Sequence, residues 1–191
     1  MLHDLDVRKP PHYERILRRS TDIQFPMNSD VLTGALLRAL ARMKPGGMFL
    51  ELGTGCGLGT CWLLDGMNPD STLVSVDNAP AVQAIARDEL GADTRITFVL
   101  EDGGEFLESC ENGFDVIYAD AWPGKYSHLA RALALLNPGG VYVIDDMLPQ
   151  PNWPEEHPPK VAALLQTLDA LQEFEIAKLS WSTGIVLAVK C

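Results

Sequence analysis

The chain of 191 residues has few cysteines and few positive charges. Its four cysteines form no CxxC pair and are irregularly spaced, so we expect neither a disulfide framework nor a structural zinc site. Lys and Arg together number 15 against 26 Asp and Glu, which gives a formal net charge of −11. Because binding to a phosphate backbone depends on clustered basic side chains, the chain is not expected to bind nucleic acid.

Long apolar runs are also missing. The charged N-terminus has no apolar leader segment, and no later apolar run approaches the roughly 20 residues that span a bilayer. We therefore expect a reduced, cytoplasmic protein with no membrane partner. With 47% hydrophobic residues, a chain of this length can bury a full core, and it is expected to form one domain over residues 1–191.

Short apolar runs alternate with segments of helical period. This alternation predicts an α/β fold in which helices cover both faces of a parallel sheet. Strands are expected at residues 48–52, 72–77, 95–100, 114–120 and 140–145. Helices are expected between and after them, at residues 58–67, 79–90, 103–110, 126–136 and 159–173.

Residues 1–45 are expected to form a helical cover over the sheet. One helix is expected near residues 12–19 and a second at 30–43, with Ser29 as the N-cap of the second. The α/β core then comprises residues 46–191.

The last third of the chain adds a loop and a hairpin to this core. Five prolines within residues 147–159 predict an irregular loop after the fifth strand, because proline lacks an amide hydrogen. The apolar runs at 174–179 and 184–190 are close enough in sequence to pair as an antiparallel hairpin at the sheet edge.

A glycine-rich loop connects the first expected strand to the following helix. It reads Glu51-Leu52-Gly53-Thr54-Gly55-Cys56-Gly57-Leu58-Gly59, and glycines in this context let the backbone approach a ligand closely. No register gives the G-x-G-x-x-G fingerprint of dinucleotide-binding folds, and no G-K-[ST] follows as a P-loop requires. An NAD-dependent oxidoreductase is therefore disfavoured.

The run E-L-G-T-G-C-G resembles the first motif of class I S-adenosylmethionine-dependent methyltransferases. The resemblance implies a Rossmann-like, doubly wound, mostly parallel seven-stranded sheet with an antiparallel C-terminal edge hairpin. In that family the loop passes beside the methionine and ribose parts of the cofactor, and the acidic residue two places before the first glycine helps to hold it. The resemblance assigns these contacts to Glu51, Gly53, Thr54, Gly55 and Gly57.

Two acidic residues after the next strands agree with the resemblance. Asp77 closes the second strand, where an acidic residue is placed to accept from ribose hydroxyls, and Asn78 follows it. Asp102 and Gly103 follow the third strand, where members of the family contact the adenine amine. Each aspartate can alternatively serve only as the N-cap of the following helix.

Three carboxylates are expected where the fourth and fifth strands end. Asp120 closes a strand similar to the family's fourth, which ends near the transferred methyl group, and Asp145 and Asp146 close the fifth. A divalent cation with oxygen ligands, Mg²⁺ first, would relieve their mutual repulsion. The arrangement resembles the catechol O-methyltransferase-like branch, whose metal is held by an Asp after strand four and an Asp-Asn pair after strand five.

The stretch after the fourth strand reads D-A-W-P-G-K-Y and departs from that branch. Pro123 stands where the branch carries its catalytic lysine, and Asp146 stands where it carries asparagine. Lys125 is the nearest replacement base, although it can equally be a surface cation that pairs with an acid. His128 is a weaker candidate for the base.

Aromatic residues surround the same region. Trp122 and Tyr126 lie beside the fourth strand's end and Trp153 lies in the proline-rich loop, positions suited to a sulfonium or a planar substrate. Loop aromatics more often serve packing. The stretch 25–29 resembles the part of the branch that folds over the cofactor.

The sequence thus indicates an S-adenosylmethionine-dependent methyltransferase that modifies a hydroxyl of a small acceptor, which can be aromatic, with help from a divalent metal. Its expected catalytic residues are Asp120 and Lys125. A metal-independent methyltransferase of the same fold that acts on a carboxylate or an amine is the first alternative. There, Asp120 is a polar neighbour of the cofactor, Asp145 a substrate contact or base, and Asp146 is solvated. A non-catalytic cofactor-binding protein is the second. Relatives of the branch often form homodimers, so a homodimer is expected.

Overall fold

The computed structural model describes residues 6–151 and 153–191 of the chain. Residues 1–5 of the expected helical cover and Asn152 of the expected loop lie outside the described residues. The strands are β1 (Met48–Leu52), β2 (Thr72–Asp77), β3 (Ile96–Leu100), β4 (Phe114–Ala119), β5 (Leu136–Ile144), β6 (Phe174–Leu179) and β7 (Ile185–Lys190). The helices are α1 (Tyr13–Asp22), α2 (Val31–Arg42), α3 (Leu58–Gly66), α4 (Pro80–Leu90), α5 (Gly103–Ser109), α6 (Leu129–Ala134) and α7 (His157–Asp169).

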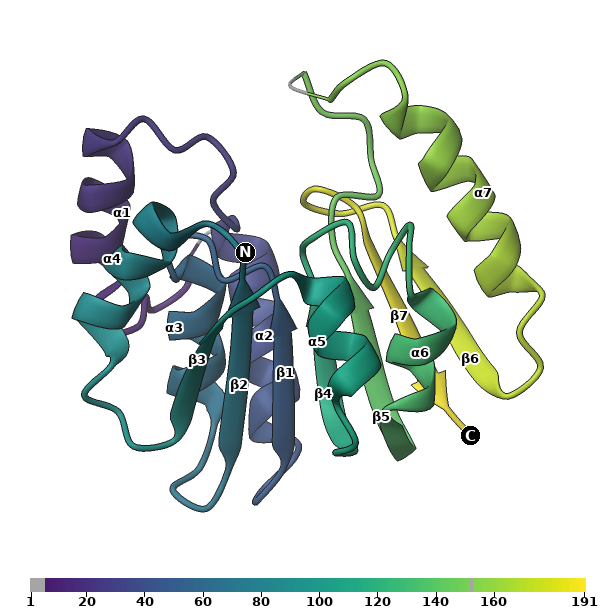
Figure 1. Cartoon of the computed structure of the whole chain (residues 1–191), viewed down its shortest axis with the longest axis horizontal. Coiled ribbons are helices and arrows are strands. Elements are labelled where there is room, and N and C mark those ends of the chain that lie inside the picture. The colour runs from purple at the N-terminus through teal and green to yellow at the C-terminus, as the bar shows by residue number, and fades with distance from the viewer. Residues whose placement is uncertain (1–5, 152) are drawn as a thin grey trace.

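The strands form a single sheet in the order β3-β2-β1-β4-β5-β7-β6 (Figure 1). The first five strands in this order are parallel, and β7 runs antiparallel to both β5 and β6. This confirms the expected mostly parallel, seven-stranded α/β sheet with an antiparallel C-terminal hairpin at its edge.

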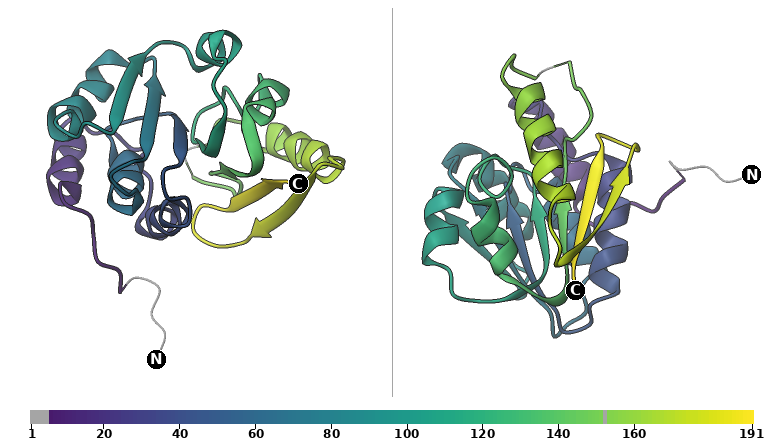
Figure 2. Two further views of the ribbon diagram at one scale, coloured as in Figure 1. Left: turned by 90° about the horizontal axis from the view of Figure 1, so that it is seen from below. Right: turned by 90° about the vertical axis from the view of Figure 1, so that its right-hand side faces the viewer.

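Helices cover both faces of the sheet, as Figure 2 shows. Strand residues alternate between faces, so neighbouring residues of β4 enter different cores. Val116 and Tyr118 pack with residues of α1 to α4, whereas Ile117 and Ala119 pack with residues of α5 to α7. Burial on both faces explains why these strands read as continuous apolar runs.

The N-terminal helices lie on the face of the sheet that Val116 and Tyr118 enter. Helix α2 packs against α3, and α1 packs against α4. A Cβ atom at Gly34 would lie 2.2 Å from the Trp62 ring, so the glycine allows α2 and α3 to approach closely. The N-cap of α2 is Asp30, whose Oδ1 accepts hydrogen bonds from the amides of Leu32 and Thr33 at 2.7 and 2.9 Å.

The expectation that Ser29 is this N-cap is therefore wrong by one residue. The carboxylate of Asp30 reaches the two amides that lack an acceptor in the first turn of the helix. The hydroxyl of Ser29 instead lies 3.2 Å from the Tyr118 hydroxyl and 3.4 Å from Oδ2 of Asp120.

The proline-rich loop is shorter than expected. Helix α7 begins at His157, with Pro158 and Pro159 in its first turn, so the prediction of an irregular loop over 147–159 is wrong at its last three residues. The first amides of a helix have no acceptor within the helix, so prolines are tolerated there. The loop itself ends at Glu156, the N-cap of α7.

Two boundaries near the fourth and fifth strands also differ from expectation. Strand β5 begins at Leu136 rather than at residue 140, because the register shifts between Phe114 and Val116 and absorbs the Asn-Pro-Gly-Gly segment into the strand. Helix α6 begins only at Leu129, because His128 adopts a left-handed conformation with φ of 57°.

Within residues 6–151 and 153–191, no helix is long and apolar enough to cross a membrane. The four cysteines, all in that part of the chain, are free, and three of them are buried. This confirms the expectation that the cysteines form no disulfide framework.

Candidate functional site

A cavity of about 680 Å³ opens at the carboxyl ends of the parallel strands. Its size lies in the range of small-molecule sites, and it sits where the strand order reverses, between β1 and β4. Of the expected site residues, it is lined by Gly53, Thr54, Gly55, Asp77, Asn78, Asp120, Lys125, Asp145 and Asp146. Glu51, Gly57, Asp102 and Gly103 are not part of its lining.

The glycine loop is pressed against the end of β4. Gly53 has φ of +99°, and a Cβ atom there would lie 2.5 Å from the backbone oxygen of Asp120. Only glycine satisfies both the left-handed conformation and this contact. Gly57 serves a different purpose, since a Cβ atom there would lie 2.8 Å from the Cβ of Ala86 in α4.

Asp77 holds the glycine loop in place. Its Oδ2 accepts a hydrogen bond from the Gly55 amide at 2.8 Å, and its Oδ1 accepts one from the Ala79 amide, also at 2.8 Å. The carboxylate thus supports the turn before α4, but the N-cap of α4 is Ala79, so the alternative that Asp77 is that cap is wrong. Since each carboxylate oxygen has two acceptor sites, Asp77 can still accept from a ligand in the cavity.

Glu51 lies buried behind the glycine loop. Its Oε2 accepts hydrogen bonds from the hydroxyls of Thr60 and Ser75, each at 2.5 Å, whereas Oε1 has no partner among the described residues. Burial raises the pKa of Glu51 to about 8, against the opposing effect of the two hydroxyls. A Cβ atom on Gly59, which lines the cavity, would lie 2.8 Å from Oε1. The unpartnered oxygen therefore lies just behind the cavity wall.

Asp102 is positioned as a helix cap. Its Oδ1 accepts hydrogen bonds from the amides of Gly104 and Glu105 at 2.8 and 3.3 Å, at the start of α5. A Cβ atom at Gly103 would lie 3.1 Å from Pro123. The contact of Asp102 and Gly103 with adenine stays a prediction.

Tyr118 joins two of the expected acidic residues. Its hydroxyl donates to Oδ2 of Asp145 at 2.8 Å and lies 3.2 Å from Oδ2 of Asp120, beside the hydroxyl of Ser29. Burial, followed by the charge of Asp145, raises the pKa of Asp120 well above its ordinary value. Burial also raises the pKa of Asp145, against the hydrogen bond from Thr183. The two carboxyls thus form one proton-sharing cluster at the cavity wall.

The chain turns sharply after β5. Asp146 adopts φ of +58°, and its amide donates to Oδ1 of Asp145 at 2.7 Å. Oδ1 also accepts from the hydroxyl of Thr183, a residue in the turn between β6 and β7. Because of this turn, Asp145 and Asp146 both line the cavity, although adjacent strand residues alternate faces.

Lys125 is a buried cation inside the site. The residue is only 4% exposed, and its Nζ donates a hydrogen bond to the backbone oxygen of Asp145 at 3.0 Å. The alternative that Lys125 is a surface cation is therefore wrong. Its charge lowers the pKa values of Asp120 and Asp145 and so opposes the effect of burial.

These residues do not fit a divalent cation well. Three protein donors, Tyr118, Asp146 and Thr183, already occupy the Asp145 carboxyl. Over the described part of the chain, no three His, Cys, Asp or Glu side chains are arranged to hold a metal ion. The cation that neighbours the acidic cluster is the ammonium of Lys125.

An aromatic wall, composed of Trp122, Tyr126, Trp153 and His157, borders the cavity on the side of α7. The imidazole of His157 stacks on the Trp153 ring at 4.1 Å, and its Nε2 lies 2.7 Å from the Tyr126 hydroxyl. Trp122 meets Tyr126 and His157 edge-on, with ring centroids 5.8 and 6.0 Å apart. Trp122, Trp153 and His157 line the cavity, and Tyr126 supports them from behind.

Sequence reasoning missed three residues of the site. Tyr118 has a readable signal, since it lies two positions before Asp120 and therefore on the same face of the strand. His157 has none, because it stands among prolines and its partner Tyr126 is distant in sequence. Thr183 reaches Asp145 only through the pairing of β7 with β5. By contrast, His128 stands at the start of α6 and does not line the cavity.

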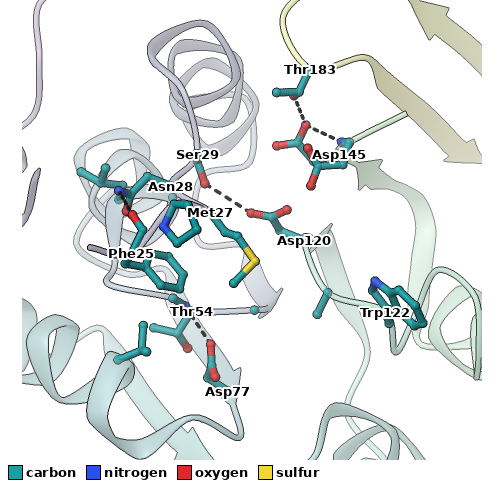
Figure 3. A pocket seen from close by; sticks show the side chains of 18 of the residues that line it. Phe25, Met27, Asn28, Ser29, Thr54, Asp77, Asp120, Trp122, Asp145 and Thr183 are labelled. Carbon is teal, nitrogen blue, oxygen red and sulfur yellow. Dashed lines mark hydrogen bonds between the residues drawn. The ribbon is translucent and has the colours of Figure 1, made fainter. Parts of the chain in front are cut away.

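The segment before α2 borders the glycine-loop side of the cavity. Phe25, Met27, Asn28 and Ser29 line it (Figure 3), and the folding of residues 25–29 over a cofactor stays a prediction. The Phe25 ring packs on the loop, 3.4 Å from the position of a Cβ atom at Gly55. Met27 is 63% exposed at the mouth.

Comparison with known families and proteins gives a consistent picture. Residues 50–147, just over half of the chain, match the family described as a methyltransferase domain. A protein of Mycolicibacterium vanbaalenii named "Putative O-methyltransferase" is 32% identical over 117 residues, which cover 58% of this chain and 52% of that protein. A protein of the same name from Mycobacteroides abscessus is 34% identical over 117 residues, covering 58% and 54%. The chain thus spans about half the length of these curated relatives.

A solved structure shares the fold over nearly the whole chain. The O-methyltransferase TomG from Streptomyces achromogenes, involved in tomaymycin synthesis and solved in complex with SAM, superposes with a TM-score of 0.85 at 22% identity. The match covers 97% of this chain and 92% of TomG. At this identity the likeness supports the fold.

Proposed function

Since the chain belongs to the methyltransferase-domain family, we propose that it transfers a methyl group from S-adenosylmethionine to a hydroxyl of a small acceptor. The observation that carries the proposal is that the glycine loop after β1, Asp77 at the end of β2 and Asp120 after β4 line the same cavity. The names of the relatives, which specify O-methylation, support the choice of a hydroxyl. We further propose that residues 1–191 act as one domain.

The residues present fit S-adenosylmethionine. When bound, it supplies a methyl group activated by a positively charged sulfur. Asp77 has acceptor sites for ribose hydroxyls, whereas Oε1 of Glu51 lies behind the cavity wall, so its contact with the cofactor stays a prediction. The glycines allow the backbone to approach the ligand. The cofactor is cationic, and the carboxylates that line the cavity favour it electrostatically.

The cavity also suggests what kind of acceptor fits. Asp77, Asp146 and the Asp120–Asp145 cluster line it, against Lys125 as the lysine of the described lining, so an anionic acceptor is disfavoured. The rings of Trp122 and Trp153 offer a surface for a flat, apolar molecule. We therefore propose a neutral or cationic aromatic acceptor that carries a hydroxyl.

The divalent metal expected from the resemblance stays a prediction. The groups around the acidic cluster favour a protein side chain as its counter-charge instead. We propose that Lys125 supplies the positive charge that the acidic cluster needs, held in place by the backbone oxygen of Asp145. In that arrangement Asp120 and Asp145 are balanced by Lys125 and by the hydroxyls of Tyr118 and Thr183. The homodimer expected from the resemblance likewise stays a prediction.

Calorimetric titration of S-adenosylmethionine into metal-stripped protein tests the proposal. Binding in the micromolar range is expected, unchanged by added Mg²⁺, with no heat from Mg²⁺ alone and none from NADH. Asp77→Asn should weaken binding about tenfold or more, because it removes a charged acceptor. Asp88→Asn makes the same charge change on the exposed side of α4 and is the matched control.

Two results would contradict the proposal in different ways. Failure to bind S-adenosylmethionine with or without Mg²⁺ would rule out the methyltransferase function. Binding that requires Mg²⁺ would retain the function and restore the metal in place of Lys125.

A further inference from the structure

O-methylation requires a group that takes the proton of the acceptor hydroxyl, because a neutral hydroxyl is a poor nucleophile. Pro123 stands where the resemblance places a lysine for this task, so the chain needs another base. Lys125 is engaged as a donor to the backbone oxygen of Asp145. Asp120 and Asp145 both accept from the hydroxyl of Tyr118, so neither carboxyl is an unengaged base.

Among the residues that the structure describes, His157 is the histidine that lines the cavity. It is 6% exposed, begins α7, and stacks on Trp153 with an angle of 20° between the rings. The hydrogen bond between its Nε2 and the Tyr126 hydroxyl and this stacking hold the ring in one orientation. Such a fixed ring is the geometry that general-base catalysis requires.

The second ring nitrogen of His157 is available. Within residues 6–151 and 153–191, Nδ1 makes no hydrogen bond, and it is not among the polar atoms sealed from solvent without a partner. With Nε2 engaged by Tyr126 and the residue in the cavity wall, Nδ1 is the ring nitrogen left for a ligand in the cavity. In a neutral imidazole one nitrogen carries the proton and the other accepts.

The surroundings of His157 favour its neutral form. Burial lowers its pKa below the ordinary value of 6.5, and the charges of Lys125 and Lys160 lower it further. Glu156, next to it in the chain, opposes this effect. Burial raises the pKa of Tyr126 to about 12, so its hydroxyl stays protonated and its oxygen can accept from Nε2. The imidazole is therefore able to take up a proton at neutral pH.

We propose that His157 is the general base of the reaction, with Tyr126 as its positioning residue. The inference rests on the proposed function, since it concerns the same cavity. The O–H bond of the acceptor breaks and its proton goes to Nδ1 of His157. The oxygen's electron pair forms the new O–CH₃ bond, and the electrons of the broken C–S bond return to the sulfur. The imidazolium then releases its proton to solvent.

Nitrogen-15 NMR of the histidine rings tests this without any acceptor. The spectrum of His157, assigned by comparison with His157→Gln, should show Nε2 protonated and Nδ1 unprotonated at neutral pH. Its pKa should lie below 6.5. Protonation of Nδ1, or a charged ring at neutral pH, would overturn the inference.

Kinetics with phenol as the acceptor probe give a second readout, because phenol stays neutral over the pH range in which His157 titrates. His157→Gln should lower kcat by about 10² to 10⁴ with little change in KM. Wild-type kcat should fall as the pH drops through the pKa of His157, because the base becomes protonated, and His157→Gln should lose this acid limb. Added imidazole should restore part of the activity of His157→Ala.

Tyr126→Phe and a control histidine complete the series. Tyr126→Phe keeps the ring but removes the partner of Nε2, so kcat should fall about tenfold and the Nδ1-protonated tautomer should become populated. His12→Gln changes a histidine outside the cavity lining and should leave kcat unchanged. An acid limb that persists in His157→Gln would assign the base elsewhere.

Calorimetry separates failure of this inference from failure of the proposed function. His157→Gln should bind S-adenosylmethionine as wild type does. If wild type does not bind it, the proposed function fails whatever the tautomer of His157. If both proteins bind it and the pH profiles coincide, only the role of His157 is refuted.

Discussion

Glu51 is a residue whose position favours ligand binding at the expense of stability. Its carboxyl is buried, it has one oxygen without a partner among the described residues, and its pKa is raised to about 8. An unfolded chain ionises the same group near its ordinary pKa of 4.5. Above that pH, folding must either protonate this carboxyl or bury its charge, and both lower the stability of the folded state. A bound cationic ligand would reduce this loss of stability.

Replacing Glu51 with glutamine should make stability less dependent on pH. A raised pKa in the folded state means that stability is fully present below pH 4.5 and is lost as the pH rises towards about 8. Glu51→Gln should thus gain stability relative to wild type across this window, by a few kcal/mol at its upper end, as measured by urea unfolding. The same variant should bind S-adenosylmethionine more weakly.

Glu175→Gln provides the matched control for this prediction. Glu175 is an exposed residue of the edge strand β6, so its replacement should leave the free energy of unfolding nearly unchanged. Parallel stability curves for wild type and Glu51→Gln would show that Glu51 is ionised in the folded protein.

At the scale of elements, the N-terminus of α2 is joined to the hairpin at the far end of the chain. Oδ1 of Asp30 caps α2, and Oδ2 accepts from the hydroxyl of Ser182 in the turn between β6 and β7. Thr183, the next residue, bonds to Asp145 in the cavity wall. The hairpin turn thus contacts both the helical cover and the site.

Asp30→Ala should lower the free energy of unfolding by about 1 to 2 kcal/mol, because two helix amides lose their acceptor. A double-mutant cycle with Ser182→Ala, measured by chemical unfolding, isolates the contact between α2 and the hairpin. A coupling energy of at least about 0.5 kcal/mol is expected for residues in direct contact. Additive effects would mean that the cap acts only within α2.

The start of α7 shows how one boundary changes the chemistry of the site. Prolines 158 and 159 mark the first turn of the helix and not the interior of a loop. Because α7 starts at His157, the imidazole is held beside Trp153 and Tyr126. A loop in its place would have left the ring without a fixed orientation.

At the scale of the whole molecule, the helical cover, the sheet and the hairpin all contribute to one cavity. Ser29 precedes α2, Asp77 and Asp120 follow central strands, and Thr183 belongs to the hairpin turn. A ligand in this cavity would contact distant parts of the chain at once. Its binding should therefore stabilise the fold as a unit.

Thermal unfolding should show one cooperative transition that S-adenosylmethionine shifts upwards. At a ligand concentration 100 times Kd, binding to the folded state alone adds about 2.7 kcal/mol to stability. Differential scanning calorimetry measures both the transition and the shift, with NADH as the control ligand. Two separate transitions would contradict the single domain, and an unchanged midpoint would contradict binding.

The local sequence predicted much of this molecule correctly. The alternation of strands and helices, the edge hairpin and the resemblance to class I methyltransferases are confirmed. The glycine loop, Asp77 and Asp120 could be brought together in advance because parallel strands end at the same edge of a sheet. That rule needs only chain order and the positions of strand ends.

The sequence did not decide the role of residues whose position suits two different roles. Asp102 follows a strand as Asp77 does, yet it caps α5 and does not line the cavity. Lys125 reads as either a base or a surface charge, and it is a buried donor to Asp145. Choosing between such uses depends on the direction of the side chain after folding.

By itself, therefore, the sequence determined the order of elements, the glycine loop and the acidic strand ends, since these depend on neighbouring residues and on periodicity. Only the tertiary structure decided that Tyr126 meets His157, that Thr183 reaches Asp145 and that Ser182 meets Asp30. The physical reason is that these contacts join residues far apart in the chain. Packing of whole elements and strand register bring them together, and no local pattern encodes either.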